Sequence, residues 1–212
     1  HAVNIRGYRD DPRVKGVDLM TGDAGLEAGY NYQEMTLIKV NMGQILVILS
    51  CLRKGGSAVV KTFLPLSCPL SVSIINLLSS LFRKVDLFKP STSHSINSEV
   101  YLILIDYRGI SADDLEILYG LLEDPNITCE SLLSDRIRPD FVSSYAKAVV
   151  RMIDRQMSFL EVSYHYYFTG SRLRQNANEW FTHNPVKPLE QPLIVEKGAI
   201  KVREIDVDST FE

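Results

Sequence analysis

Three ionisable residues of this 212-residue sequence stand at the ends of apolar segments. Asp23 follows VDLMTG, Lys61 ends the apolar part of GGSAVVKTF, and Glu99 precedes VYLILID. An ammonium beside a buried strand is costly to desolvate unless it has a partner. Alone, each residue has a plainer explanation, a turn for Asp23 or a surface ion pair for the other two. Together they favour a site in which two carboxylates orient a lysine.

The surrounding elements alternate in an order typical of an α/β domain. Apolar spacing predicts helices over 33–54 and 69–82 and strands over 17–23, 57–62, 84–88 and 100–106. We predict a largely parallel sheet with an antiparallel last strand. Parallel strands present their carboxyl ends at one edge, so Asp23 and Lys61 belong to one rim. Glu99 reaches that rim only if its own strand runs antiparallel to its neighbours.

The second half of the sequence has a different character. Ser111 and Asp114 form a capping box that predicts a helix to about residue 122, and helical spacing predicts another helix over 141–167. A proline-rich connector follows. We therefore predict a division into residues 1–110, which hold the sheet, and residues 111–212, a mostly helical extension with a terminal hairpin.

The composition excludes several classes of protein. The formal net charge of -3 excludes a globally basic nucleic-acid binder, although a local basic groove is compatible with it. The three cysteines form no CxxC pair and the four histidines lack metal-ligand spacing, so we expect neither a disulfide framework nor a structural zinc. No apolar run reaches the roughly 18 residues that span a bilayer. We expect a soluble, intracellular protein without a membrane partner. The cytoplasm is the favoured compartment, including a viral factory or virion if the protein is viral, and the nucleus is the alternative.

Three segments between residues 17 and 107 resemble the motifs of one enzyme family. DLMTGDAG is similar to the aspartate motif of FtsJ-like ribose 2′-O-methyltransferases, GGSAVVKTF to their lysine strand, and LFKPSTSHSINSEVYLI to their K-P-x-S-S-R-x-x-N-S-E-x-Y segment. Within that family the resemblance is to the mRNA cap-1 enzymes, including viral proteins carried by large DNA viruses. The last motif is the most specific because so many residue types keep the same spacing.

The resemblance implies a Rossmann-like fold, S-adenosylmethionine as cofactor and a Lys-Asp-Lys-Glu tetrad. It implies Lys61 as general base with Asp23 and Glu99 as partners, and Gly22 and Asp23 at the cofactor. The implied substrate-binding residues are Lys89, Ser91, Ser93, His94 and Asn97, with His94 where the family usually has arginine. The family's first lysine and glycine-rich loop lie upstream of the aspartate strand, and nothing in residues 1–16 matches them. We therefore expect residues 1–110 to be the C-terminal half of a methyltransferase domain.

The implied chemistry explains these residue types. A ribose 2′-hydroxyl is a poor nucleophile, so a base must take its proton as it attacks the methyl carbon of a sulfonium. A lysine serves as that base only when its pKa is lowered from about 10.4 by desolvation or by a second cation. Carboxylates favour the charged ammonium instead. Asp23 and Glu99 are therefore expected to orient Lys61 and to balance the charge of the sulfonium.

Two functions of different classes follow from the sequence. The first is an RNA ribose 2′-O-methyltransferase that acts on capped mRNA or another RNA. The second is a non-catalytic RNA-binding or scaffolding subunit with a degenerate methyltransferase fold. The expected partners are RNA, the upstream half of the same protein and other subunits of a capping apparatus. Lys147, Arg151 and Arg155 interleave with aspartates, so we expect them to form the polar face of a helix.

Overall fold

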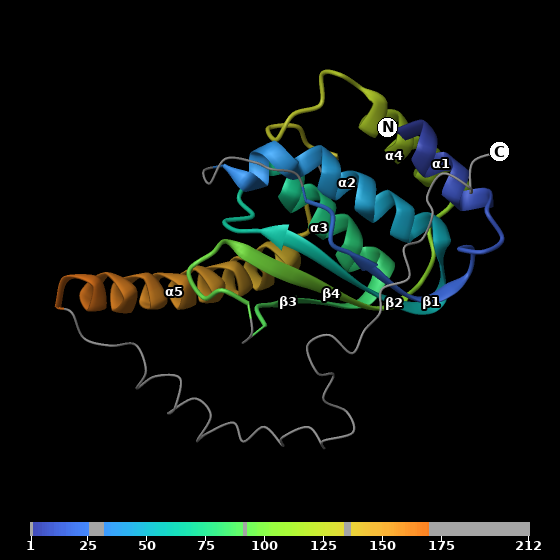
Figure 1. The fold of residues 1–212 in the computed structure, drawn as a ribbon. Helices are drawn as coiled ribbons and strands as arrows, with labels where there is room; N and C mark the ends of the chain where they lie inside the picture. Colours follow the sequence, from blue (N-terminus) through green and yellow to red (C-terminus); the bar gives the residue numbers. More distant parts are fainter. Residues whose placement is uncertain (1, 26–31, 91–92, 134–136, 170–212) are drawn as a thin grey trace, which may run out of the picture. The chain divides into compact units, whose positions relative to one another are not determined.

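Four strands form one mixed sheet in the spatial order β1-β2-β4-β3 (Figure 1). The computed structural model describes residues 2–25, 32–90, 93–133 and 137–169. The strands are β1 (Val17–Gly22), β2 (Leu52–Phe63), β3 (Phe82–Phe88) and β4 (Glu99–Tyr107). β1 is parallel to β2, and β4 is antiparallel to both β2 and β3. This confirms the predicted sheet, largely parallel with an antiparallel last strand.

The register of β4 decides where Glu99 lies. In the pairing of β2 with β4, Lys61 lies opposite Tyr101 and Phe63 lies opposite Glu99. The start of β4 therefore meets the end of β2. Because of this antiparallel direction, Glu99 lies at the same rim of the sheet as Lys61, which is the condition that a shared site requires.

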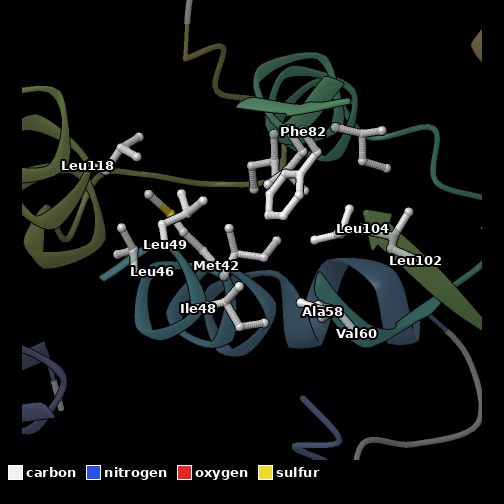
Figure 2. Close-up of a cluster of buried hydrophobic side chains, with 14 of the residues drawn as sticks. Met42, Leu46, Ile48, Leu49, Ala58, Val60, Phe82, Leu102, Leu104 and Leu118 are labelled. Carbon is white, nitrogen blue, oxygen red and sulfur yellow. The ribbon is translucent and has the colours of Figure 1, made fainter. Parts of the chain in front are cut away.

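Helices α2 (Gln33–Cys51) and α3 (Pro69–Leu81) cover one face of the sheet (Figure 1). The apolar side chains between them and the strands form one core (Figure 2). Those drawn include Met42, Leu46, Leu49, Ala58, Val60, Phe82, Leu102 and Leu104. α2 is long and apolar enough to cross a membrane by length and composition, but 61% of that stretch is buried inside the fold. Packing in the core therefore explains its apolar character.

The other face of the sheet is less covered in the described part of the chain. Successive side chains of a strand point to opposite faces. Val60 and Thr62 are buried on the helix side, whereas Val59 and Lys61 are half-buried on the other side. Leu19 of β1 lies on that second face with 61% of its surface exposed. Lys61 thus reaches the rim from the more open face.

The periodicity predicts that this helix ends at residue 54, but α2 ends at Cys51. Leu52 is extended, with φ −71° and ψ 132°, and buried. Arg53 donates to Asp18 of β1 at 2.8 Å instead of closing the last helical turn. Gly55 has a φ of +81°, which glycine adopts without strain, close to the point where the β1 register shifts. Strand pairing therefore overrides the local preference for helix.

Two further helices, α1 (Ala2–Asp10) and α4 (Ala112–Glu123), pack against α2. The Ser111 hydroxyl accepts from the Asp114 N–H at 3.0 Å, which confirms the predicted helix cap. The sequence pattern did not predict α1. Long-range ion pairs hold it, since Arg6 and Arg9 both bind the carboxylate of Glu116 on α4.

The long helix α5 (Pro139–Thr169) runs beside the edge strand β3. Arg138, just before it, donates to the Ser79 hydroxyl at 2.8 Å, and the Tyr145 hydroxyl donates to the Leu66 carbonyl. Gln156 donates to the Ile96 carbonyl at 3.0 Å, beyond the end of β3. α5 therefore runs in the same direction as β3. A groove of about 250 Å³ separates the first half of α5 from β3 and α3.

The chain divides into two compact units, residues 1–164 and 165–212. Side chains of α4 and α5, including Leu115, Tyr119, Phe141 and Val149, belong to the core of the sheet. Of the second unit the structure describes only residues 165–169, the end of α5. The predicted proline-rich connector and terminal hairpin lie outside the described residues.

Candidate active site

Lys61 and Asp23 form an ion pair where the carboxyl ends of β1 and β2 meet. The Lys61 ammonium contacts Asp23 Oδ1, and it lies 3.5 Å from the Asp23 carbonyl oxygen. The Lys61 side chain is 14% exposed, whereas that of Asp23 is 71% exposed. The lysine therefore approaches from inside the fold and the aspartate from solvent.

Gln44 of α2 holds the turn that carries Asp23. Its Oε1 accepts a hydrogen bond from the Ala24 N–H at 2.7 Å, and its amide donates to Asn41 at 3.2 Å. A Cβ at Gly22 would lie 2.9 Å from the same Oε1, so a side chain there would displace the Gln44 amide. The sequence alone does not identify Gln44. Helical spacing shows that it lies beside buried positions of α2, but not that its side chain contacts the turn after β1.

Glu99 lies at the same rim and is held by two hydroxyls. Tyr101 donates to Glu99 Oε1 at 2.9 Å, and Ser93 donates to the same oxygen at 3.4 Å. Burial, the hydrogen bond to Glu99 and the nearby charges of Glu99 and Asp23 raise the pKa of Tyr101 to about 12. Within the described residues, Asp23 is the ion-pair partner of Lys61, while Glu99 pairs with these hydroxyls. Tyr101 could have been found from the sequence, because it follows Glu99 by two and shares its strand face.

Lys89 turns into the loop between β3 and β4. Only 8% of its surface is exposed, and its ammonium donates to the Glu99 carbonyl at 2.7 Å and to the Asn97 carbonyl at 3.0 Å. The Asn97 side-chain oxygen accepts a third bond. All three ammonium hydrogens thus bind the loop itself. Burial lowers the pKa of Lys89, while the charge of Glu99 acts against that shift.

The other residues of this loop differ in position. His94 is exposed at the tip, where its carbonyl accepts from the Asn97 N–H at 3.2 Å. Ser93 is half-buried beside Glu99. Ser91 lies outside the described residues. The structure therefore places Ser93 at the rim and His94 on the surface above it, while Lys89 and Asn97 bind each other.

The first residues of α2 tie this loop to the rest of the rim. Gln33 accepts a hydrogen bond from the Ser98 hydroxyl at 2.6 Å. Glu34 is buried, and its carboxylate accepts from the N–H groups of Ser67 at 3.1 Å and Cys68 at 2.9 Å, at the start of α3. One helix end thus positions both loops that flank the end of β2.

The rim as a whole has the features of an enzyme site built on an α/β sheet. A shielded lysine, an exposed aspartate and a hydrogen-bonded glutamate converge where the carboxyl ends of parallel strands meet, which is where ligands bind in open α/β sheets. Such a group can hold a cation and move a proton.

Comparison with known proteins identifies the family. A sequence model described as FtsJ-like methyltransferase matches residues 1–107, and the chain belongs to this family. It is 43% identical over 201 residues to an uncharacterized protein of Acanthamoeba polyphaga mimivirus, covering 89% of this chain and 26% of that protein. It is 33% identical over 200 residues to cap-specific mRNA (nucleoside-2′-O-)-methyltransferase 2 of Drosophila melanogaster, covering 86% of this chain and 28% of that enzyme.

A further relative and a solved structure are also similar to this chain. The mouse cap-specific mRNA (nucleoside-2′-O-)-methyltransferase 1 is 41% identical over 125 residues, covering 56% of this chain and 15% of that enzyme. A ribosomal RNA methyltransferase of Plasmodium falciparum superposes with a TM-score of 0.38 at 19% identity, covering 46% of this chain and 50% of that one. The chain spans about a quarter of the length of the first two relatives.

Proposed function

We propose that this chain is part of an S-adenosylmethionine-dependent RNA ribose 2′-O-methyltransferase that acts on capped mRNA. The observation that carries the proposal is the contact of Lys61 with Asp23 at the rim that Glu99 also reaches. Family membership supports methyl transfer as the reaction. The names of the Drosophila and mouse relatives support a capped mRNA as the substrate.

Lys61 is the proposed general base. Once deprotonated, its amine would take the proton of the 2′-hydroxyl as the hydroxyl oxygen bonds to the methyl carbon, which would leave the sulfonium sulfur of the cofactor as a neutral thioether. Asp23 fixes the position of Nζ, and the 14% exposure of the lysine keeps most water away from it. Glu99 is held by Tyr101 and Ser93 and adds a second negative charge beside the reacting groups.

The rim fits a cationic cofactor at the end of β1. Asp23 contacts Lys61 with one oxygen, and its 71% exposure leaves the carboxylate accessible to a positively charged ligand. Gly22 precedes it and carries no side chain that could obstruct the approach. Gly22 and Asp23 are therefore the residues proposed to hold S-adenosylmethionine, which supplies a methyl group on a sulfonium centre when bound.

The test is methyl transfer to capped RNA by the full-length protein carrying Lys61→Ala. Loss of a general base lowers kcat by about 100-fold or more. Lys54→Ala is the matched control, because Lys54 is an exposed lysine at the other end of β2. Nuclease digestion of the product identifies the methylated ribose.

Three outcomes separate the alternatives. A Lys61→Ala enzyme with the rate of the wild type shows that the base is another residue. A methylated base in place of a methylated ribose contradicts the proposed reaction. A full-length wild-type protein that binds RNA but neither binds S-adenosylmethionine in calorimetry nor transfers methyl groups is a scaffolding subunit.

A further inference from the structure

Four side chains of α5 recur at intervals of four residues: Lys147, Arg151, Arg155 and Phe159. Residues four apart are neighbours on a helix surface. These three cations and one aromatic ring, which we call the α5 ridge, are all exposed, Phe159 by 40%. The Arg155 guanidinium carbon lies 6.0 Å from the centroid of the Phe159 ring.

The α5 ridge passes beside the loop of the candidate active site. Gln156 is the residue after Arg155, and its amide donates to the Ile96 carbonyl at 3.0 Å. Ile96 lies in the same turn as the exposed His94. Arg155 is close enough for its charge to add to the burial that lowers the pKa of Lys89. The hydrogen bond places this part of α5 at the β3–β4 loop, and the effect of the Arg155 charge on Lys89 agrees with that position (Figure 1).

In the described part of the chain, the acidic side chains of α5 are not ion-paired with the arginines of the α5 ridge. Asp154 and Glu161 lie on the same helix, yet within the described ranges neither forms an ion pair with Arg151 or Arg155. The sequence interpretation of a merely solvated polar face rested on these interleaved acids. The position beside the loop gives the two arginines a site at which their charge can act on a ligand.

We propose that the α5 ridge binds the single-stranded RNA that extends from the active-site loop, with Arg151 and Arg155 on phosphates and Phe159 against a base. Cations that follow the backbone and an aromatic platform for stacking are the combination that binds single strands without reading sequence. This inference rests on the proposed function, because RNA enters at the β3–β4 loop only if the rim modifies it. It assigns a role to the helical segment after the sheet.

The test compares the salt dependence of RNA binding by full-length proteins. Each phosphate contact to a single strand contributes about 0.7 to the slope of log affinity against log salt. Arg151→Gln with Arg155→Gln is expected to reduce the slope by about 1.4 and to weaken binding of a long capped RNA by roughly tenfold or more at 0.1 M salt. Lys15→Gln with Lys54→Gln removes the same charge near the starts of β1 and β2, at the opposite end of these strands from the rim, and is the matched control.

The outcomes distinguish this inference from the proposed function. An unchanged slope in the arginine variant, or an equal fall in the control, overturns the role of the α5 ridge while RNA methylation by the wild type still supports the enzyme. A wild-type protein that neither binds capped RNA nor methylates it overturns both.

Ultraviolet crosslinking of the wild-type protein to capped RNA is an independent measurement that does not depend on how the variants fold. The expected crosslink joins a nucleotide to the peptide that contains Phe159. Crosslinks to the β3–β4 loop that never extend to α5 contradict the inference.

Discussion

Lys61 of β2 lies directly opposite Tyr101 of β4, and the Tyr101 hydroxyl donates to Glu99 at 2.9 Å. The strand pairing thus connects the proposed base to a carboxylate through the hydroxyl of a tyrosine. Asp23 binds the lysine from the other side, from the turn after β1. The rim is therefore organised around Lys61 from two neighbouring strands at once.

Tyr101→Phe is expected to lower kcat for capped RNA about tenfold, since hydrogen bonds to charged groups are worth about 1.5–3 kcal/mol. The variant removes the donor that holds Glu99 and leaves the ring in place. Steady-state kinetics measure the effect. Tyr8→Phe, at a half-exposed tyrosine of α1, is the control and should match the wild type. Equal kcat values for the wild type and Tyr101→Phe would show that Glu99 needs no hydroxyl partner.

Lys89→Met is expected to reduce the free energy of unfolding by about 1–3 kcal/mol, because two half-buried carbonyl groups, of Asn97 and Glu99, lose their donor. Urea denaturation measures this loss. The salt slope of RNA binding should stay at the wild-type value, because the ammonium faces the loop. A slope reduced by about 0.7 would mean that Lys89 contacts a phosphate after all. Lys84→Met, at an exposed lysine of β3, is the control for stability.

Glu34→Ala is expected to destabilise the protein by about 3 kcal/mol, because two N–H groups at the start of α3 lose a charged acceptor. Glu34→Gln keeps one acceptor oxygen and should lose less. Chemical denaturation of both variants beside Glu130→Ala, at an exposed glutamate, measures the difference. A loss no larger than that of Glu130→Ala would contradict the role of Glu34.

The stability of the α1–α4 contact is expected to depend on pH. Hydrogen bonds from Arg6 and Arg9 lower the pKa of Glu116 below its usual value of 4.5. A carboxyl with a lowered pKa stabilises the fold above its ordinary pKa, and this contribution disappears as the pH falls through the folded value. Glu116→Gln should therefore be less stable than the wild type at neutral pH and equal to it in strong acid. A difference that persists in acid would contradict the ion pairs as its cause.

The general position of the site could be predicted because strand ends have a sequence signal. An apolar run that ends in a charged residue marks both the strand and its end, and Asp23 and Lys61 have this pattern. Glu99 could be placed at this rim only because the last strand, β4, is predicted to run antiparallel to its neighbours. These inferences use local patterns and one topological rule, which is why the structure reproduces the sheet and its rim.

Contacts between distant segments could not be predicted in the same way. The end of α2 depends on the pairing of Arg53 with Asp18, and α1 depends on Glu116, more than 100 residues along the chain. The motif around Lys89 identifies the loop, but only the closed loop shows that the ammonium has three acceptors inside it. Side-chain direction at such positions follows from tertiary packing, and a single sequence carries no pattern for it.

The central position of β4 has a consequence for how the protein is made. β4 follows the other strands of the described sheet along the chain, yet β3 has no other partner in that sheet, and the rim lacks Glu99 and Tyr101 until β4 has paired with β2. Until then both strands expose unpaired backbone groups. The reactive centre therefore assembles only when the chain has been translated through Tyr107.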